Sequence, residues 1–327
     1  MTTIVNFLQR AIVQGIPLLY GSCGEIITEK SGNLNLGIPG IMYVGAVSGV
    51  IGAFFNERIA GDKLNPFFAV LVPLLCSLLG SLLMSLIYGF LTVTLRSNQN
   101  VAGLALTTFG VGVGNFFGGS LATLYGEGGA LSLKRTSDFF KTALPFASKL
   151  GDFGKLFFSY GFLAYLAVIV AIVAAIILRK TRVGLNLRAV GESPATADAA
   201  GINVNRYKYL AICIGGMIAG LGGLYFIMDY TCGVWSNGGF GDRGWLAIAL
   251  VIFAIWKPDM AALGSALFGG LYVVYIFIPN LSRSSQELFK MLPYLATIVV
   301  LIATSMRKKR EHQPPQSLGL AYFREDR

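Results

Sequence analysis

Long stretches without any Asp, Glu, Lys or Arg recur along this chain and leave it few ways to fold. Six of them cover residues 31–56, 70–95, 97–126, 156–178, 209–228 and 260–282, and two shorter ones cover 244–256 and 291–306. A helix needs about 20 mostly apolar residues to cross the hydrocarbon core of a bilayer. Because lipid offers no hydrogen bonds to the backbone, such stretches fold as membrane-spanning helices.

A further apolar stretch, residues 11–24, lies near the amino terminus, where a secretory signal peptide is the alternative. The tract Leu19–Cys23 imitates a lipoprotein cleavage site, but Tyr20 stands where Leu is expected. The chain that follows is itself predicted to lie in the membrane. We therefore interpret residues 11–24 as an uncleaved first span.

The composition agrees with a membrane protein. Hydrophobic residues make up 54% of the chain and charged residues 13%, whereas soluble domains carry about 25% charged residues. Glycine is abundant, at 41 of 327 residues, which suits closely packed or broken helices. The expected fold class is all-α: a polytopic membrane protein of roughly 8–10 transmembrane helices with glycine-rich broken or re-entrant segments.

Several function classes have little material in this sequence. The four cysteines show no C-x-x-C spacing, and the single histidine, His312, lies in a polar tail. We therefore expect no metal, no cofactor bound by this chain and no histidine-based catalysis. The net charge of +10 is concentrated in short clusters beside apolar runs, which favours lipid and membrane topology over nucleic acid as its cause.

Basic residues near span ends predict the orientation, because Lys and Arg are enriched on the cytoplasmic side. One cluster surrounds the loop 181–206 and another opens the tail at Arg307–Arg310, so both are expected in the cytoplasm. The predicted transmembrane domain covers 1–306 and the polar cytoplasmic tail 307–327. Counting back places the turn at Arg96 inside and the loop 120–155 outside. The amino terminus falls outside unless an early segment is re-entrant, which stays open.

Three glycine-rich stretches are poor ordinary spans. Residues 32–40 combine two amides, three glycines and a proline, which indicates either a broken helix at a transport path or a tight turn. Residues 97–119 contain G-x-x-x-G pairs at Gly110/Gly114 and Gly114/Gly118, like Gly45/Gly49 and Gly216/Gly220 elsewhere. These pairs predict close helix packing, and Asn115 between them needs a polar partner.

The third stretch, residues 235–245, places two tryptophans around a polar glycine-rich loop. Interfacial anchoring of the indoles and stacking against a planar solute are the two interpretations. The adjacent Asp242 and Arg243 are expected at the membrane surface rather than buried. Asp229 is expected at a span end.

The loop 181–206 contains a short helix with clear start and stop signals. Ser193 is a predicted N-cap, Pro194 the first helical residue and Gly201 the stop, which predicts a helix from Pro194 to about Ala200. A helix this short is unstable alone in water. Its small side chains offer little to bury against their own chain, so docking to another protein is one interpretation and an ordinary connecting loop the other.

At this loop the sequence resembles the permease subunits of ATP-binding-cassette importers, in the branched-chain amino acid, simple-sugar and nucleoside branch. The stretch Gly24–Gly37 resembles a signature near the start of nucleoside permeases that work with basic membrane lipoproteins. Two residues depart from these motifs. Pro39 stands where an acidic residue is expected in a Gly-x-Glu-Gly pattern, and Ser193 stands where Asn is common. The resemblance covers most of residues 10–305.

The resemblance implies a bacterial cytoplasmic-membrane importer with several subunits. The expected partners are two ATPase subunits that hold ATP and Mg, a second homologous permease in a heterodimer, an external substrate-binding lipoprotein and the lipid bilayer. The chain itself lacks a G-x-x-x-x-G-K-[ST] motif; Gly154–Leu156 is the nearest approach. It is therefore not expected to be an enzyme.

Within this interpretation, two groups of residues are candidates for function. The substrate path is assigned to the following amide and aromatic side chains: Asn33, Asn35, Asn98, Asn100, Phe109, Asn115 and Phe116. Coupling to the ATPase is assigned to the following loop residues: Gly191, Glu192, Ser193, Pro194, Ala195, Thr196, Ala197, Ala200 and Gly201.

Other solutes and classes stay as alternatives. Scarce charge within the spans suits a neutral nucleoside, and a ribose-type sugar almost equally. A secondary transporter or channel would normally keep ionisable residues mid-span, and the sequence places none clearly there. A membrane enzyme would need a cluster of catalytic side chains, which Glu25, Glu29 and Glu127 do not form in sequence.

Overall fold

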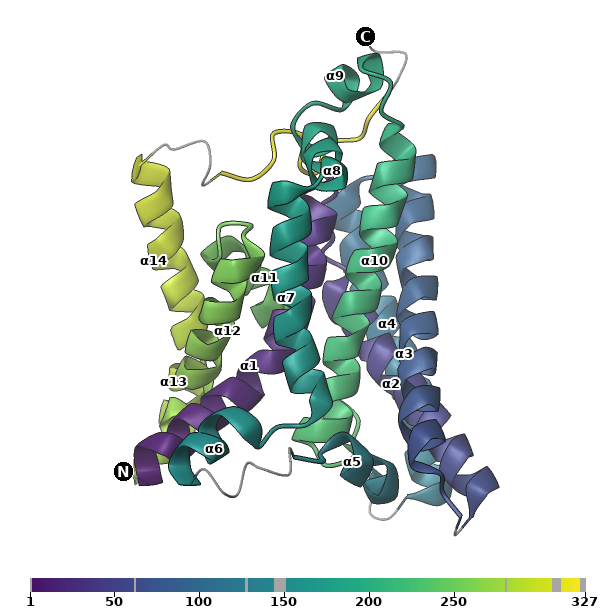
Figure 1. The fold of residues 1–327 in the computed structure, drawn as a ribbon, viewed down its shortest axis with the longest axis vertical. Helices are drawn as coiled ribbons and strands as arrows, with labels where there is room; N and C mark the ends of the chain where they lie inside the picture. Colours follow the sequence, from purple (N-terminus) through teal and green to yellow (C-terminus); the bar gives the residue numbers. More distant parts are fainter. Residues whose placement is uncertain are drawn as a thin grey trace.

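The computed structural model describes residues 2–61, 63–126, 129–143, 151–279, 281–307 and 313–323. Helices form almost all of the regular structure in these ranges (Figure 1). The first half contains α1 (Thr2–Glu29), α2 (Ile38–Ala60), α3 (Pro66–Gly89) with a π-helical extension η1 (Phe90–Thr94), α4 (Gln99–Tyr125), α5 (Lys134–Phe140) and α6 (Gly151–Phe158).

The second half contains α7 (Phe162–Lys180), α8 (Arg182–Glu192), α9 (Pro194–Ala199), α10 (Val204–Tyr225) with a π-helical extension η3 (Phe226–Tyr230), α11 (Arg243–Phe253), α12 (Pro258–Val273) with a 3₁₀ turn η4 (Val274–Phe277), α13 (Arg283–Lys290) and α14 (Leu292–Arg307). Two short strands, β1 (Leu131–Ser132) and β2 (Val234–Trp235), pair antiparallel with Leu131 opposite Trp235.

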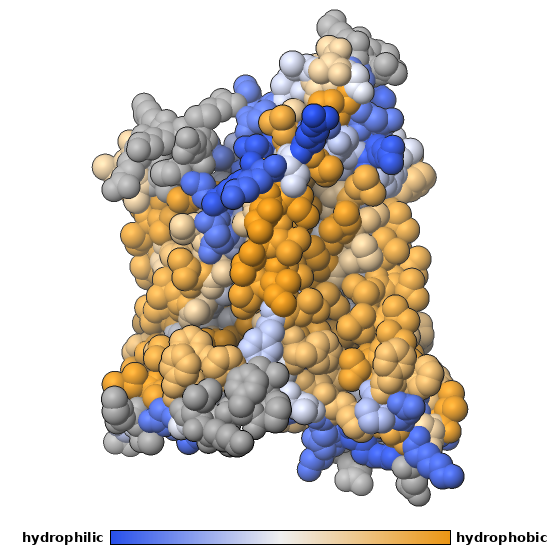
Figure 2. Space-filling view, viewed as in Figure 1, coloured by the Kyte–Doolittle hydropathy of each residue, from blue (hydrophilic) through white to orange (hydrophobic). Residues whose placement is uncertain are grey.

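The helices form a membrane-spanning bundle, which confirms the predicted fold class. Seven of the described helices are long and apolar enough to cross a bilayer. The 28-residue α1 also runs through the bundle, whereas α11, with 11 residues, covers only part of the thickness. Figure 2 shows a broad hydrophobic band across the visible face of the bundle with hydrophilic residues gathered at both ends, the surface expected of a protein solvated by lipid.

Small residues let the central helices approach closely. In the α2 span 83% of residues are buried and in the α10 span 72%. A Cβ on Gly45 would lie 2.6 Å from Gly220 Cα, and one on Gly110 would lie 2.6 Å from the Gly40 carbonyl oxygen. These positions hold backbone against backbone, so the prediction that the G-x-x-x-G pairs pack helices is confirmed.

The two ends of the bundle carry different connections. Helices α8 and α9 and the last described residues lie at one end, called the α9 end here (Figure 1). The amino terminus, α5 and α6 lie at the other, called the amino-terminal end. The turn at Arg96 belongs to the α9 end, because its guanidinium lies 4.7 Å from the centre of the Phe323 ring.

Candidate functional site

The segment between α1 and α2, residues 31–37, is irregular backbone inside the bundle and is called the broken segment here. Its start is set by Gly32, whose φ of +85° suits glycine. Lipid cannot satisfy exposed peptide groups, and here side chains of neighbouring helices do so. Asn35 N donates to Glu25 Oε1 (3.0 Å) and Leu34 N to Gln99 Oε1 (2.7 Å). Tyr88 OH donates to Leu34 O (2.6 Å) and Thr107 Oγ1 to Leu36 O (2.7 Å).

The two asparagines predicted for the substrate path lie in the broken segment and are fully buried. Asn35 Oδ1 accepts a bond from Gly37 N at 2.9 Å, and Asn33 Nδ2 donates one to Ser31 Oγ at 2.7 Å. Among the described residues, Asn33 Oδ1 and Asn35 Nδ2 have no hydrogen-bond partner. In this conformation both amides therefore shape the segment and are covered by protein.

Two carboxyl groups lie beside the broken segment, one helical turn apart on α1. Glu25 and Glu29 are 0% and 3% exposed. Glu29 accepts a hydrogen bond from the indole of Trp256, which follows α11 in a left-handed conformation with φ of +52°. No ionisable residue was clearly placed at mid-span from the sequence, and the structure adds that these two carboxyl groups are buried in the last turns of α1. Their burial could not be predicted from the sequence, because two glutamates that follow an apolar run are expected at the membrane surface.

A second irregular segment, residues 231–242, leads from α10 to α11. Trp235 is 1% exposed and packs on Tyr43 with ring centres 5.2 Å apart. A Cβ on Gly118 would lie 2.2 Å from the Trp235 ring. This indole therefore belongs to the protein core, and neither interfacial anchoring nor stacking on a solute describes it.

Arg243, at the start of α11, is buried, so its predicted interfacial position is wrong; only Asp242 is exposed. The Arg243 guanidinium lies over the rings of Phe226 and Tyr230, at 4.4 and 5.0 Å from the ring centres. Arg243 Nη1 donates to the Phe240 carbonyl at 2.8 Å, and Nη2 to Gln14 Oε1 at 3.4 Å. In the described part of the chain no carboxylate forms an ion pair with it.

The remaining predicted path residues are spread along α4 and face different surroundings. Asn98 caps this helix by accepting from Val101 N at 3.1 Å, and Asn100 is exposed at the same end. Asn115 has the polar partner it was predicted to need, because its Oδ1 accepts from Tyr43 OH at 2.6 Å. Phe109 and Phe116 are 55% and 67% exposed on the outward face. The seven candidates thus do not form one cavity within this chain.

Helix α9 begins and ends at the predicted residues. Ser193 accepts from Thr196 N at 3.4 Å, Pro194 is the first helical residue, and Gly201 has a φ of +83°. Exposed positions on α9 and after it are Ala195, Thr196, Ala199, Ala200 and Gly201.

The expectation that the small side chains of α9 bury little against their own chain is wrong for Ala197. Ala197 is 3% exposed and packs in a small cluster with Val190 and Val204, so it anchors α9 to its own chain. Gly191, also assigned to coupling, is likewise buried: a Cβ there would lie 2.3 Å from the Lys30 carbonyl oxygen. Glu192 is exposed at the end of α8.

A basic pocket of about 560 Å³ opens at the α9 end, between the ends of α1, α7 and α8 and the start of α12. Lys30, Arg179, Arg188 and Lys257 contribute its cationic groups, and Arg179 pairs with Asp259 at 2.6 Å. Burial lowers the pKa of the Lys30 ammonium, and the nearby Glu192 carboxylate opposes that shift. The concentration of positive charge matches a surface that faces water and anionic headgroups.

Three groups of residues hold the irregular segments or the α9 end in place, and these roles were not predicted from the sequence. Tyr88 and Gln99 hold the broken segment, Arg243 holds the second irregular segment, and residues 313–323 fold back on the bundle. Gln99 stands within the polar run Ser97–Asn100, whose asparagines alone were assigned to the path. The other two groups carry no local signal, because their partners are far away in sequence.

Comparison with known proteins agrees with this arrangement. Residues 7–301 match the family model described as branched-chain amino acid transport system / permease component. The chain is 34% identical to the nucleoside ABC transporter permease protein NupC of Lactococcus lactis subsp. cremoris (strain MG1363), over 91% of this chain and 93% of that protein. It is 31% identical to the guanosine ABC transporter permease protein NupQ of Bacillus subtilis (strain 168), over 96% of this chain and 95% of that protein.

A third relative, the putative glucose ABC transporter permease protein TsgC13 of Haloferax volcanii, is 29% identical over 99% of both chains. The family match runs from within α1 to within α14 and so includes nearly all of the helical bundle. The chain belongs to the branched-chain amino acid transport system / permease component family.

Proposed function

We propose that this chain is the permease subunit of an ATP-driven importer of nucleosides in a bacterial cytoplasmic membrane. The observation that carries the proposal is α9, a capped helix that presents small exposed side chains at one end of the bundle. Such a helix offers a flat surface into which a motor subunit can dock. ATP and Mg belong to that separate ATPase, and the α9 end faces the cytoplasm.

The names of two relatives support the choice of solute, since NupC is named for nucleosides and NupQ for guanosine. The putative glucose permease favours sugar import as the second candidate. A nucleoside has flat ring faces and hydroxyl groups, so aromatic and amide side chains are sufficient to bind it without a charged partner.

We assign the substrate path to the outward face of α4, between this chain and a second, homologous but non-identical permease. The α4 span has the lowest mean hydropathy of the seven candidate spans, 1.4, yet only 39% of it is buried within this chain. Large apolar side chains on its exposed face, among them Leu104, Phe109 and Phe116, are available to pack against a second subunit. Phe109 and Phe116 lie seven residues apart on that face, and an external lipoprotein delivers solute to the amino-terminal end.

Uptake of labelled solutes tests the proposal. Cells with and without the gene, with the other subunits intact, are given labelled guanosine, ribose and glucose. Loss of guanosine uptake alone is the expected result. Loss of ribose or glucose uptake alone would replace the nucleoside with a sugar, and unchanged uptake of all three would contradict the proposal.

The coupling role of α9 has its own test at Ala199, which is exposed, rather than at the buried Ala197. Ala199→Glu is expected to reduce uptake at least tenfold, because a charged side chain would hold the ATPase away from the helix. Ala199→Ser is the matched control, since it keeps the small size and should retain uptake. Equal uptake by both variants, at equal membrane content, would remove α9 from the coupling surface.

A further inference from the structure

The last described residues of the chain pack against the α9 end of the bundle. Residues 313–323, called the C-terminal strap here, run across this end of the bundle (Figure 1). Pro315 and Ser317 are buried, and Leu318 packs against the main hydrophobic core. A polar tail was expected from the sequence, and these residues are instead part of the folded structure.

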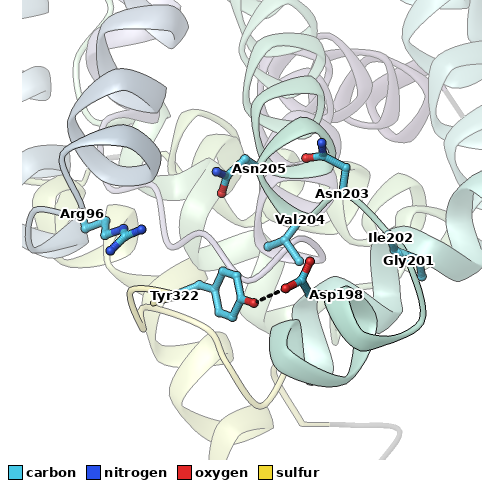
Figure 3. A pocket seen from close by; sticks show the side chains of 8 residues that line it. All are labelled: Arg96, Asp198, Gly201, Ile202, Asn203, Val204, Asn205 and Tyr322. Carbon is cyan, nitrogen blue, oxygen red and sulfur yellow. Dashed lines mark hydrogen bonds between the residues drawn. The ribbon is translucent and has the colours of Figure 1, made fainter. Parts of the chain in front are cut away.

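The strap is bonded to the region of α9 at two places. Ser317 donates to the Gly191 carbonyl through both its backbone N, at 3.0 Å, and its Oγ, at 2.6 Å. Tyr322 OH donates to Asp198 Oδ2 on α9 at 2.9 Å, as Figure 3 shows. The Tyr322 ring also packs against the cluster that contains the buried Ala197. Movement of α9 therefore acts directly on the strap.

The same strap is bonded to the broken segment and to the start of α4. Gly319 N donates to the Gly32 carbonyl at 3.2 Å, at the first turn of the broken segment. The Leu320 carbonyl accepts from Gln99 Nε2 at 3.3 Å, while Gln99 Oε1 accepts from Leu34 N. One glutamine side chain thus joins the strap to the middle of the broken segment.

The contacts form a continuous route from α9 to the interior of the bundle. Between α9 and the Arg96 turn lies a pocket of about 430 Å³, and Tyr322 lies between those two walls (Figure 3). Arg96, which lines this pocket, also lies over the ring of Phe323. Chains of hydrogen bonds and packed side chains such as these are one way in which movement of one element biases another.

We propose that the C-terminal strap is a positioning element that passes the movement of α9 to the broken segment during transport. This rests on the proposed function of α9. Tyr322 and Ser317 hold the α9 side of the strap, and Gly319 and Leu320 hold the side of the broken segment. None of these residues contacts the solute; they act through the segment that they hold.

The test uses the complete transporter, with its ATPases, in proteoliposomes loaded with ATP. Guanosine uptake and ATP hydrolysis are measured together, and the ratio of solute moved to ATP hydrolysed is the readout. Tyr322→Phe removes only the hydroxyl bonded to Asp198. It is expected to lower the ratio at least threefold while the ATPase remains bound and active.

A pair of variants at the partner residue separates coupling from loss of folding. Asp198→Asn keeps an oxygen that can accept from Tyr322 and should retain most of the wild-type ratio, whereas Asp198→Ala should resemble Tyr322→Phe. Ala321→Ser is the matched control within the strap, because Ala321 is next to Tyr322 and takes part in none of the bonds named above. It should behave like the wild type.

The outcomes separate the two proposals. If the wild-type complex moves no guanosine, the proposed function fails. If the wild type transports and Tyr322→Phe and Asp198→Ala both keep its ratio of uptake to ATP hydrolysis, the strap plays no part in coupling. A truncation that ends at Pro314 is expected to abolish uptake, and retained uptake by that variant would also overturn the inference.

Discussion

At the scale of single residues, Arg243 shows how this chain keeps a charge inside a membrane protein. Desolvating a guanidinium is costly unless other groups replace water. Here the replacement comes from the Phe226 and Tyr230 ring faces and from the Phe240 carbonyl. Because the side chain also donates to Gln14 on α1, it ties the second irregular segment to the first helix.

Replacement of Arg243 should loosen this junction. Arg243→Met loses the carbonyl bond and the ring contacts, and we expect a loss of about 2 kcal/mol in stability. Arg243→Lys should recover only part of it, because an ammonium group lacks the planar donor geometry. Thermal unfolding of the purified chain in detergent measures this. Asp242→Asn, at the exposed neighbour, is the control; an Arg243→Met variant as stable as this control would contradict the prediction.

The residue scale is also where reasoning from sequence succeeds and fails most visibly. The cap at Ser193 and the stop at Gly201 were predicted because capping depends on residues a few positions apart. The burial of Ala197 and Arg243 was not, because it depends on Val204, Tyr322 and Gln14. Local chemistry can be predicted from the sequence, whereas contacts between distant residues depend on how the helices assemble.

At the scale of elements, the packing of α2 against α4 depends on glycines that meet backbone to backbone. Gly110 contacts the Gly40 backbone, whereas a Cβ on Gly112 would have nothing within 4 Å. The two glycines of one G-x-G pattern therefore have different roles. The stripe of glycine repeats predicted that α4 packs closely, but it did not identify α2 as the neighbour.

This difference gives a matched pair of substitutions on one helix. Gly110→Ala should force α2 and α4 apart and destabilise the chain by about 1–3 kcal/mol, as overpacking does in cores. Gly112→Ala should leave stability unchanged or raise it by up to about 1 kcal/mol, because its Cβ enters open space and alanine favours the helix. Unfolding of the purified chain in detergent compares the two. Similar changes in stability for both variants would mean that the contact with α2 does not distinguish these positions.

At the scale of the whole molecule, the bundle has two chemically different ends, and which side of the membrane each one faces stays a prediction. Cysteine labelling tests it in a variant whose four native cysteines are replaced by serine. A cysteine at Thr142, exposed near the amino-terminal end, should react with an impermeant maleimide in intact spheroplasts. A cysteine at Ala199 should react only after lysis. The reverse pattern would invert the topology and exclude α9 as a cytoplasmic docking helix.

The all-helical nature of the membrane domain could be predicted from the sequence because long uncharged runs have few alternatives in lipid. The number was less exact, since seven of the described helices are long and apolar enough to cross a bilayer, against the 8–10 expected. The arrangement of the candidate path residues could not be predicted. Asn33 and Asn35 are enclosed by protein, while Phe109 and Phe116 lie on the outward face of α4. Under the proposed function, the asparagines and the phenylalanines would meet in one path only with a second permease, and the sequence of one chain does not describe that interface.

The broken segment also sets the order in which this protein can be assembled. Its peptide groups bond to Tyr88, Gln99 and Thr107, which are synthesised more than fifty residues after it. Until α3 and α4 have entered the membrane, the peptide groups of Leu34 and Leu36 lack these partners, and we expect the segment to stay near water. The bond from Gly319 to Gly32 closes the same segment from the far end of the described chain, so the first turn of the broken segment gains this partner only after α14 has been made.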